Sequence, residues 1–536
     1  MLFNATGTAI VFCFLENFSE CRSGCIFETS NNLRKTEENH LVFYNMAFPE
    51  NNEKKKEWIT VIGIVLFFTL LYALISLVNH YLFRTHAFDL GIKNHAIFDY
   101  AHFRFNETTI IQPSYKNYLA NHFSLITIFV SPLYYLFHSY TLLIVQIASV
   151  VIGGLGVYKY FRTFYPDSSF PASAAMIHFF SLWGIYSALA FDYHENVVAA
   201  MILPWFFYFF RKEKWVPAFL VSLLIMTCKE NMALWMGFVA GGLLLYHFKS
   251  PGKRWFSLGV TIFSFVYFVL VLKVLIPWLG SDGRDFIHFD YSYTLGDGFG
   301  EAFQTMLSEP FTMLKYHFVN HLENCTYDGI KAELHWMVLL GGGFAFLFKP
   351  HYLVMLIPVY AQKLLHDDPQ KWGINFHYSI EFVPILTFAL FETLVQIKNY
   401  AWKKWAMIAG VLLAFGSNID KIDSRKSVWY KSEKHRFYSP AHYTTSANVS
   451  FIHKVIDKIP PDAAVSASET IVPHIAFRDR IYMFPFIKDA DYVVLNTELS
   501  SFPLQEDLFQ FCIEELKTDE EWELIIDEHD TYLFKR

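Results

Sequence analysis

A carboxylate able to do chemistry lies just beyond the first long apolar run of the chain. Asp89 belongs to the segment Phe88–Asp99, Phe-Asp-Leu-Gly-Ile-Lys-Asn-His-Ala-Ile-Phe-Asp. At the boundary between water and lipid a carboxylate stays ionised at little cost, and it can meet a substrate that is anchored in lipid. We therefore predict that this segment carries the chemistry of the protein. The alternative is that Asp89 caps a helix starting near Leu90, because Asp is favoured at that position.

Further groups that bind ligands follow the ends of later apolar runs. Asp192, His194 and Glu195 lie together after one run and are suited to binding a divalent cation or hydroxyl groups. The alternative for these three residues is a polar helix end at the membrane interface. Lys229 follows another run and can pair with a phosphate group. Alternatively, Lys229 extends its ammonium group to the interface or pairs with Glu230.

Four isolated polar residues complete the set of candidates. His122, His377 and Tyr378 can donate hydrogen bonds to phosphate or hydroxyl groups, although an isolated interfacial His is more often structural. Arg284 lies between two Asp residues in a long loop and is a candidate for a mobile phosphate clamp; ordinary solvation of the loop is the alternative. The metal is unknown, because two carboxylates with one His suit Mg²⁺ or Mn²⁺ less well than a set of oxygen ligands. A Mg or Mn cofactor is therefore an open expectation.

The composition indicates a membrane protein. The chain has 536 residues, of which 54% are hydrophobic and 17% charged, and aromatic residues make up 19%. These values are too apolar for an ordinary soluble protein and suit helices that face lipid. The net charge of −7 and the lack of a long basic stretch argue against nucleic acid as a partner. The six cysteines are scattered, whereas structural zinc needs about four ligands.

The distribution of lysine and arginine predicts how the chain crosses the membrane. Lys54–Lys56 precede the first span, Trp58–His80, and place the N-terminus in the cytoplasm by the positive-inside rule. The loop 84–139 is then outside, with Phe123–Phe137 as a re-entrant or interfacial helix. Continuing in this way gives about eleven transmembrane helices within residues 58–417. Nearly every basic turn then lies on one side, and nearly every cluster of His with Asp or Glu lies on the other.

The two ends of the chain differ in composition from this apolar part. Residues 1–57 are predicted to be a disordered cytoplasmic segment, and Met46 is a plausible alternative start. Residues 418–536 are charged, contain no span and form a small extracytoplasmic α/β domain by parity of the spans. Predicted strands cover residues 463–467, 481–484, 492–495, 522–526 and 531–535, and predicted helices cover 469–477 and 504–516. This domain lacks a glycine-rich phosphate loop, which argues against a nucleotide site.

Several short stretches, in order and spacing, resemble the family of predicted membrane proteins called domain of unknown function 2079. They are Phe88–Ile92, Asn121–Ser124, Asp192–Glu195, Lys229–Asn231, Phe376–Tyr378, Val465–Ser468 and Tyr492–Leu495, and the resemblance covers roughly residues 58–500. Where the family commonly continues as Gly-Ile-Phe-Asp-Gln, this chain has Gly91-Ile92-Lys93-Asn94-His95. The family in turn resembles the GT-C glycosyltransferase superfamily, which implies a catalytic Asp or Glu in the first outer loop and a sugar donor linked to polyprenyl phosphate.

The resemblance implies a glycosyltransferase that moves a sugar from a polyprenyl-phosphate donor to an acceptor hydroxyl on the outer membrane face. Asp89 is then the catalytic base, and a positioned base contributes about 10²–10⁴-fold to the rate. The expected location is a bacterial-type inner membrane, with the lipid-linked sugar and the bilayer as partners. A transporter or flippase is the alternative, but it favours ionisable residues near mid-membrane and paired broken spans. A non-catalytic membrane scaffold is a third possibility.

Overall fold

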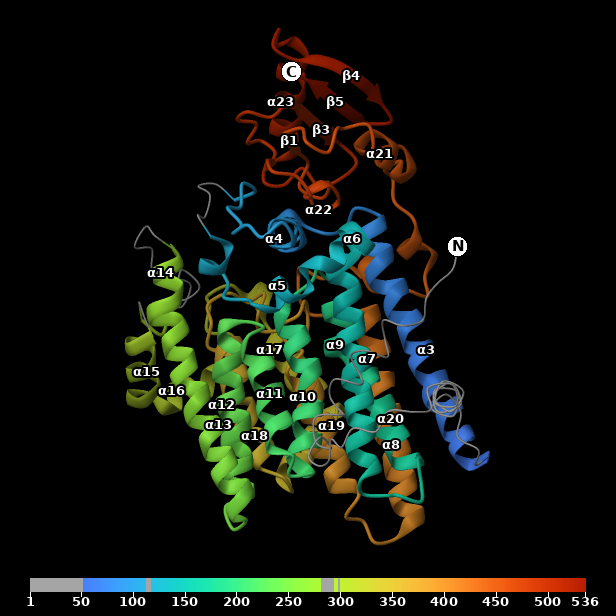
Figure 1. Ribbon diagram of the computed structural model, residues 1–536, viewed down its shortest axis with the longest axis vertical. Helices are drawn as coiled ribbons and strands as arrows, with labels where there is room; N and C mark the ends of the chain where they lie inside the picture. Colours follow the sequence, from blue (N-terminus) through green and yellow to red (C-terminus); the bar gives the residue numbers. More distant parts are fainter. Residues whose placement is uncertain (1–51, 112–116, 281–293, 297–298) are drawn as a thin grey trace, which may run out of the picture. The chain divides into compact units, whose positions relative to one another are not determined.

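The helices of the chain are built from its apolar runs, and many of them are shorter than a bilayer is thick. The computed structural model describes residues 52–111, 117–280, 294–296 and 299–536. The described helices of the apolar part are α3 (Asn52–Tyr81), α7 (Thr141–Arg162), α8 (Phe170–Ser181), α9 (Trp183–Leu189), α10 (Glu195–Arg211), α11 (Trp215–Met226), α12 (Glu230–Tyr246), α13 (Pro251–Leu270), α14 (Ile276–Gly280), α15 (Phe299–Ser308), α16 (Pro310–Tyr316), α17 (Ile330–Leu340), α18 (His351–Leu364), α19 (Phe382–Leu394) and α20 (Tyr400–Asp423) (Figure 1). The contacts divide the chain into two units, Met1–Leu66 and Phe67–Arg536, and the fold described below belongs to the second. Arg284, Met46 and nearly all of the predicted N-terminal segment lie outside the described residues.

Four helical segments are long and apolar enough to span a membrane. They are Lys54–Tyr81, Ile126–Arg162, Pro251–Gly280 and Tyr400–Asp423, and the pair α8 and α9, bent by 46°, gives a fifth candidate. The other described helices, such as α19 with 13 residues, are too short to cross about 30 Å of hydrocarbon as straight helices. Eleven spans therefore stay a prediction. The short helix α19 is almost entirely buried, whereas the long helix α13 exposes apolar side chains, so α19 lies in the interior of the protein.

Close packing of α7 against its neighbours depends on two adjacent glycines. A Cβ at Gly153 would lie 2.4 Å from the carbonyl oxygen of Met201 on α10, and one at Gly154 would lie 2.0 Å from the ring of Phe180 on α8. Small residues at such positions allow helix backbones to approach closely inside membranes. This packing holds the middle of α7 close to α8 and α10.

The segment predicted as an interfacial helix is a series of short helical turns. It contains α5 (Ile126–Val130) and α6 (Tyr134–Phe137), with a 3₁₀ turn around Pro132 between them. Neither helix is long enough to span alone, and both precede α7. Before them, a π-helical turn, η2 (Ala87–Gly91), leads directly into α4 (Ile92–Ala101).

The predicted C-terminal α/β fold is confirmed. Five strands form one sheet in the order β2-β1-β3-β5-β4, in which β1 pairs in parallel with β2 and β3, and β5 pairs antiparallel with β3 and β4. The strands are β1 (Val465–Ala467), β2 (Ile481–Met483), β3 (Tyr492–Asn496), β4 (Glu523–Glu528) and β5 (Thr531–Lys535). Its helices are α21 (Val449–Ile456), α22 (Val472–Ile475) and α23 (Glu506–Thr518). The helix predicted over 469–477 is wrong in its length, because only α22 is helical there.

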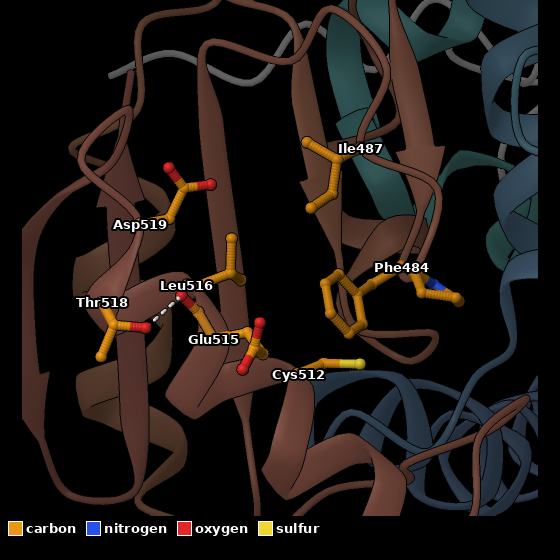
Figure 2. Close-up of a pocket in the computed structure, with 8 residues that line it drawn as sticks. Phe484, Ile487, Cys512, Glu515, Leu516, Thr518 and Asp519 are labelled. Carbon is orange, nitrogen blue, oxygen red and sulfur yellow. Dashed lines mark hydrogen bonds between the residues drawn. The ribbon is translucent and has the colours of Figure 1, made fainter.

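One hydrophobic core joins this domain to the segment that carries Asp89. Ile92 and Ala96 of α4 are buried in the same cluster as Val465 of β1 and Val472 of α22. At Gly91 a Cβ would lie 3.0 Å from the side chain of Val472, so the two segments touch without intervening side chains. In Figure 1, α4 and α22 lie between the sheet and the ends of the apolar helices. On another part of the domain, a hollow of about 460 Å³ is lined by Phe484, Cys512 and Leu516 (Figure 2).

Candidate functional site

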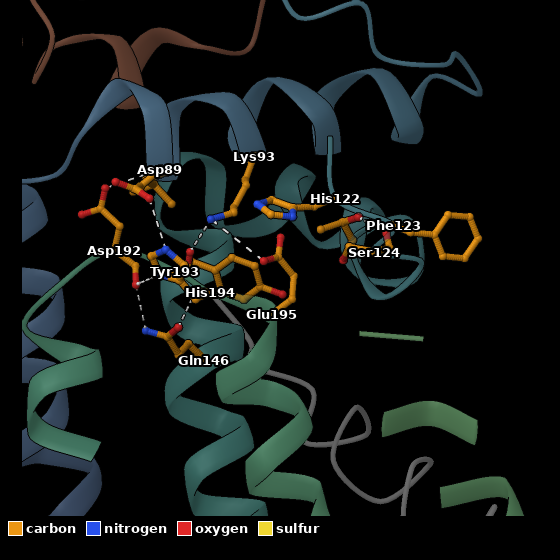
Figure 3. Close-up of polar contacts among 12 residues, drawn as sticks. Asp89, Lys93, His122, Phe123, Ser124, Gln146, Asp192, Tyr193, His194 and Glu195 are labelled. Atoms are coloured by element: carbon orange, nitrogen blue, oxygen red, sulfur yellow. Dashed lines mark hydrogen bonds and ion pairs between the residues drawn. The ribbon is translucent and has the colours of Figure 1, made fainter. Parts of the chain in front are cut away.

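Asp89 points from the turn η2 toward the residues between α9 and α10 (Figure 3). Its Oδ1 lies 3.2 Å from Nε2 of His194, and the side chain keeps 31% of its surface exposed. Burial alone would raise the pKa of Asp89, but the hydrogen bond to His194 and the charge of Lys93 outweigh it and hold the pKa below the usual range. The carboxylate is therefore ionised and open to a ligand on one side.

The ring of His194 faces an oxygen atom at each nitrogen. Nδ1 lies 3.2 Å from the carbonyl oxygen of Asp192, and Nε2 faces the carboxylate of Asp89. Burial and the charge of Lys93 lower the pKa of His194 to about 4, so the ring is neutral near pH 7. A neutral imidazole has a single N–H. Whichever ring nitrogen carries the proton, the contact at the other nitrogen lies between two hydrogen-bond acceptors. One further proton at that contact would turn it into a hydrogen bond, so that both contacts are hydrogen bonds.

Asp192, not Asp89, caps the turn that begins this segment. Its Oδ2 accepts hydrogen bonds from the backbone N–H of His86, at 2.7 Å, and of Leu90, at 3.2 Å. The alternative prediction that Asp89 caps a helix near Leu90 is therefore wrong, because Asp89 lies inside the turn and its side chain faces His194. Burial raises the pKa of Asp192 to about 6. Asp192 thus positions Asp89, although the two residues are 103 positions apart in sequence.

Lys93 and Glu195 form a second buried pair beside this one. The ammonium group of Lys93 donates to the carbonyl oxygen of Tyr193 at 2.9 Å and lies 4.0 Å from Oε2 of Glu195. Neither carboxylate oxygen of Glu195 has a hydrogen-bond partner among the described residues. Lys93 lies in the stretch where this chain departs from its family's pattern, and its neighbour Asn94 donates to the carbonyl oxygens of Pro473 and Ser139. The departure therefore supplies contacts that hold the site together.

Glu230 binds the segment that contains His122. One of its oxygens lies 3.1 Å from Nδ1 of His122, and the other accepts from the backbone N–H of Phe123 at 3.1 Å. Lys229 is half-buried and forms no ion pair with Glu230, which contradicts the prediction of that pair as its structural alternative. After burial itself, the charge of Lys229 is the largest influence that lowers the pKa of His122. Lys229 thus contributes positive potential to the site, and within the described part of the chain it forms no ion pair.

The ring of His377 stacks on the ring of His194. Its ring centroid lies 3.4 Å from that of His194, with 16° between the ring planes, and 4.2 Å from that of Tyr378. The preceding residue, Phe376, has a φ of 57°, so the backbone turns sharply to bring His377 here. Burial, the neighbouring His194 and Lys229 all lower the pKa of His377. A neutral His377 allows stacking on His194 without repulsion between charges.

Sequence reasoning missed four residues that hold the outer segment. Gln146 of α7 donates to the carbonyl oxygen of Asp192 at 3.4 Å and accepts from the N–H of His194 at 2.8 Å. His86 lies 2.7 Å from Glu469 of the C-terminal domain and 2.9 Å from the ammonium group of Lys434. A lone Gln in an apolar run was a signal for Gln146. His86, Lys434 and Glu469 carry no comparable local pattern.

Two of the three predicted cation ligands are engaged elsewhere. Asp192 binds backbone N–H groups through Oδ2, and His194 faces Asp89 and a carbonyl oxygen. The third, Glu195, has both carboxylate oxygens without a hydrogen-bond partner among the described residues. Within the described ranges no three His, Cys, Asp or Glu side chains are placed to hold a metal ion, so this set does not fit a resident Mg²⁺ or Mn²⁺.

Comparisons with known proteins give a family and a distant structural similarity. An oligosaccharyltransferase from Archaeoglobus fulgidus, in its apo form, has 11% identity and a TM-score of 0.39, covering 82% of this chain and 70% of that chain. The same enzyme tethered to an acceptor peptide with an NVT sequon has 12% identity and a TM-score of 0.39, covering 83% and 70%. A TM-score of this size does not assign a fold. No curated protein matches the chain. The model of the predicted membrane protein family DUF2079 matches residues 79–523, and the chain therefore belongs to that family.

Proposed function

We propose that this protein is a membrane glycosyltransferase that moves a sugar from a polyprenyl-phosphate donor to an acceptor hydroxyl. The proposal rests on the two contacts of the His194 ring, one with Asp89 and one with the carbonyl oxygen of Asp192. A neutral ring has one proton for these two contacts. A proton delivered to this pair replaces a repulsive contact between acceptors with a hydrogen bond. The pair is therefore suited to take a proton from a hydroxyl group in the transition state, as a general base does.

The transfer balances as a single displacement. The acceptor oxygen attacks the anomeric carbon of the sugar, its proton passes to Asp89, and the bond between the anomeric carbon and the phosphate oxygen breaks. The polyprenyl phosphate leaves with the electron pair of that bond. Lys229 supports this step, because a half-buried ammonium group that forms no ion pair among the described residues can stabilise a departing phosphate.

The remaining candidates are proposed to contact the donor around this centre. His377 and Tyr378 line the side of His194 that the ring stack covers, and His122 lies on the segment held by Glu230. Their N–H and O–H groups suit sugar hydroxyls and phosphate oxygens. Glu195 is proposed to bind sugar hydroxyls, because its two carboxylate oxygens have no hydrogen-bond partner among the described residues.

The proposed membrane arrangement keeps about eleven spans, a cytoplasmic N-terminus and an extracytoplasmic C-terminal domain in a bacterial-type inner membrane. Support comes from the opposite ends of α10, which begins at Glu195 beside the candidate site and ends at Arg211 among basic residues. Under the positive-inside rule the basic end faces the cytoplasm. The proposed domains are 1–57, 58–417 and 418–536, although α20 continues through the second boundary to Asp423.

The experiment that tests the proposal measures turnover by the purified full chain in vesicles. Polyprenyl-phosphate donors carrying different radiolabelled sugars are incubated with the protein, and release of sugar from the lipid is followed. We expect release with at least one donor. The proposal fails if no donor is consumed and the same vesicles show protein-dependent flux of a solute, which would indicate a transporter. Profiling glycans and lipids in a deletion strain would identify the acceptor.

A further inference from the structure

A second polar site lies at the opposite ends of the same helices. A cavity of about 200 Å³ is lined by residues from the ends of α7, α10, α12 and α19 and the start of α18. Helix α10 connects it to the candidate site, and its 17 residues place the two about 24 Å apart at 1.5 Å per residue. The inference below does not depend on the proposed function.

The lining of this cavity has a net positive charge. Among its described lining residues, Arg211, Lys253 and Lys349 are cationic and Glu392 is the one acidic residue. Lys253 lies 3.6 Å from Glu213, but the Glu213 side chain is 60% exposed, so water screens that pair. An anion inside the cavity would therefore meet an excess of positive charge.

Arg211 is held in a fixed orientation at the cavity. Its Nε donates to Oγ1 of Thr163 at 2.6 Å, and its guanidinium carbon lies 3.4 Å from the centre of the Phe164 ring. A guanidinium group fixed in this way loses little freedom when it binds a ligand, and its planar fork matches the oxygens of phosphate. Arg211 also hydrogen-bonds the Tyr160 side chain, and a guanidinium group has five N–H donors, so it can hold these two contacts and still bind a ligand.

The charges of two residues that line the cavity, Glu392 and Lys349, compensate each other. Glu392 accepts from the hydroxyl of Tyr160 and lies 3.7 Å from the ammonium group of Lys349, which in turn donates to the hydroxyl of Tyr246 at 2.7 Å. Glu392 thus neutralises Lys349, and the remaining positive charge belongs to Arg211 and Lys253.

An unpartnered polar atom also lines the cavity. His351 is only 5% exposed, and its Nδ1 has no hydrogen-bond partner among the described residues. Its ring is stacked on Tyr246 with 4.1 Å between the centroids, so it is fixed in place. A buried polar atom without a partner is costly, and a ligand that hydrogen-bonds it removes that cost.

We propose that this cavity binds a phosphate group, carried by a phospholipid headgroup or by a soluble phosphate ester. Basic pockets between transmembrane helices on one membrane face bind anionic headgroups. Arg211 and Lys253 bind the phosphate oxygens, His351 donates or accepts a further hydrogen bond, and the aromatic walls contact the rest of the molecule. Phosphate here would connect the helix ends that lead to the Asp89 site.

The test measures binding of two probes to the purified full chain in detergent. Dihexanoyl phosphatidylglycerol represents the lipid source and glycerol 3-phosphate the soluble source, each titrated by calorimetry. We expect saturable binding of at least one probe, weakened about 10–100-fold in Arg211→Gln, as loss of a charge-assisted hydrogen bond predicts. Binding of the lipid alone assigns a headgroup site, and binding of glycerol 3-phosphate assigns a site for soluble esters.

A matched control separates a built site from diffuse attraction. Lys212→Gln removes the same charge from the next residue, whose side chain is exposed and does not line the cavity. This variant should bind the probe within about two-fold of the wild type. Lys253→Gln provides the second test should Arg211→Gln fail to fold. The proposal is overturned if the wild type binds neither probe or if Lys212→Gln weakens binding as much as the cavity variants do.

Discussion

The two ends of α10 show opposite ways of placing charge in an apolar protein. At the Glu195 end, four segments converge: the first loop, α7, the turn before α10 and the loop before α19. Several buried polar atoms there have no hydrogen-bond partner in the described part of the chain. At the Arg211 end, the cavity is built mostly from helix termini, and one carboxylate, Glu392, binds both a tyrosine and a lysine.

The difference supports the proposal that the Glu195 end does the chemistry. A buried polar group without a partner destabilises the fold, so it persists where a ligand or a reaction uses it. Asp192 Oδ1, His377 Nδ1 and both carboxylate oxygens of Glu195 are such atoms, and they surround the Asp89–His194 pair. The Arg211 end has one such lining residue, His351, but it also has an excess of positive charge and an Arg211 side chain held by Thr163, which suit a binding site.

Replacing Asp89 should have the largest effect and should act on activity alone. Asp89→Asn removes the proton acceptor but keeps an oxygen near His194, so we expect the rate of sugar release to fall about 10²–10⁴-fold. The free energy of unfolding should change by about 1 kcal/mol or less. Initial rates in reconstituted vesicles and thermal unfolding in detergent measure the two quantities.

Asp489→Asn is the matched control for this substitution. Asp489 pairs with Arg480 in the C-terminal domain, and its side chain is 55% exposed. The same chemical change there should leave the rate of sugar release within about two-fold of the wild type. Equal loss of rate in both variants, or full activity in Asp89→Asn, would refute Asp89 as the base.

The buried pair of Lys93 and Glu195 should dominate stability at this end. Lys93→Gln leaves Glu195 as an unpaired buried carboxylate, which should lower the free energy of unfolding by about 3–5 kcal/mol. Adding Glu195→Gln to that variant removes the unpaired charge and should restore part of the loss. Denaturant unfolding of the two single variants and the double variant gives the coupling energy. Additive losses would show that the 4.0 Å contact between the two side chains carries no interaction.

Asp192 should make the stability of this end depend on pH. Burial raises its pKa to about 6, above the value of about 3.9 in an unfolded chain. The folded protein therefore binds a proton between these values that the unfolded chain does not bind, so this contribution to stability is present at low pH and lost as pH rises through about 6. Its full size is about 3 kcal/mol, from 1.36 kcal/mol for each pKa unit.

Asp192→Asn should remove that dependence. The amide oxygen of Asn can still accept from the N–H groups of His86 and Leu90, so the turn is kept. Between about pH 4 and about pH 7 the wild type should lose stability relative to this variant. Thermal unfolding of both proteins across that range measures the difference. Parallel curves would show that Asp192 does not titrate there.

Much of the fold follows from local sequence patterns. Apolar runs ending in lysine or arginine predict helices such as α7 and α10, and the strands β1, β2 and β3 lie within a residue or two of the predicted ones. Local patterns do not show which helices are buried in protein, because a helix such as α19 is apolar on all sides in either environment. Because of this ambiguity, the sequence predicts about eleven spans, whereas fewer of the described helices are long enough to cross a membrane.

The sequence predicts candidate site residues but not the contacts between them. The predicted topology places Asp89, Asp192, His194 and Lys229 on one side, and the structure brings Asp89 against His194. The pairing of His86 with Glu469 joins residues 383 apart in sequence, and no local pattern encodes it. The choice of Asp192 over Asp89 as the cap also depends on tertiary packing. The roles of these residues in catalysis stay predictions.

Lys229 should give the smallest effect, confined to recognition of the donor phosphate. A charge-assisted hydrogen bond to phosphate contributes about 1.5–3 kcal/mol, so Lys229→Gln should raise the KM for the polyprenyl-phosphate donor about 10–100-fold. Lys229→Arg should retain most of the affinity, because it keeps the charge, and Lys214→Gln, an exposed lysine beyond the other end of α10, should leave KM unchanged. If Lys229 only extends to the interface, Lys229→Gln should leave the KM unaltered.

The charge of Lys229 also lowers the pKa of His122 and His377, so its removal should raise both pKa values. A change in KM together with a shifted pH profile would place Lys229 at the phosphate, on the end of α10 that carries the chemistry.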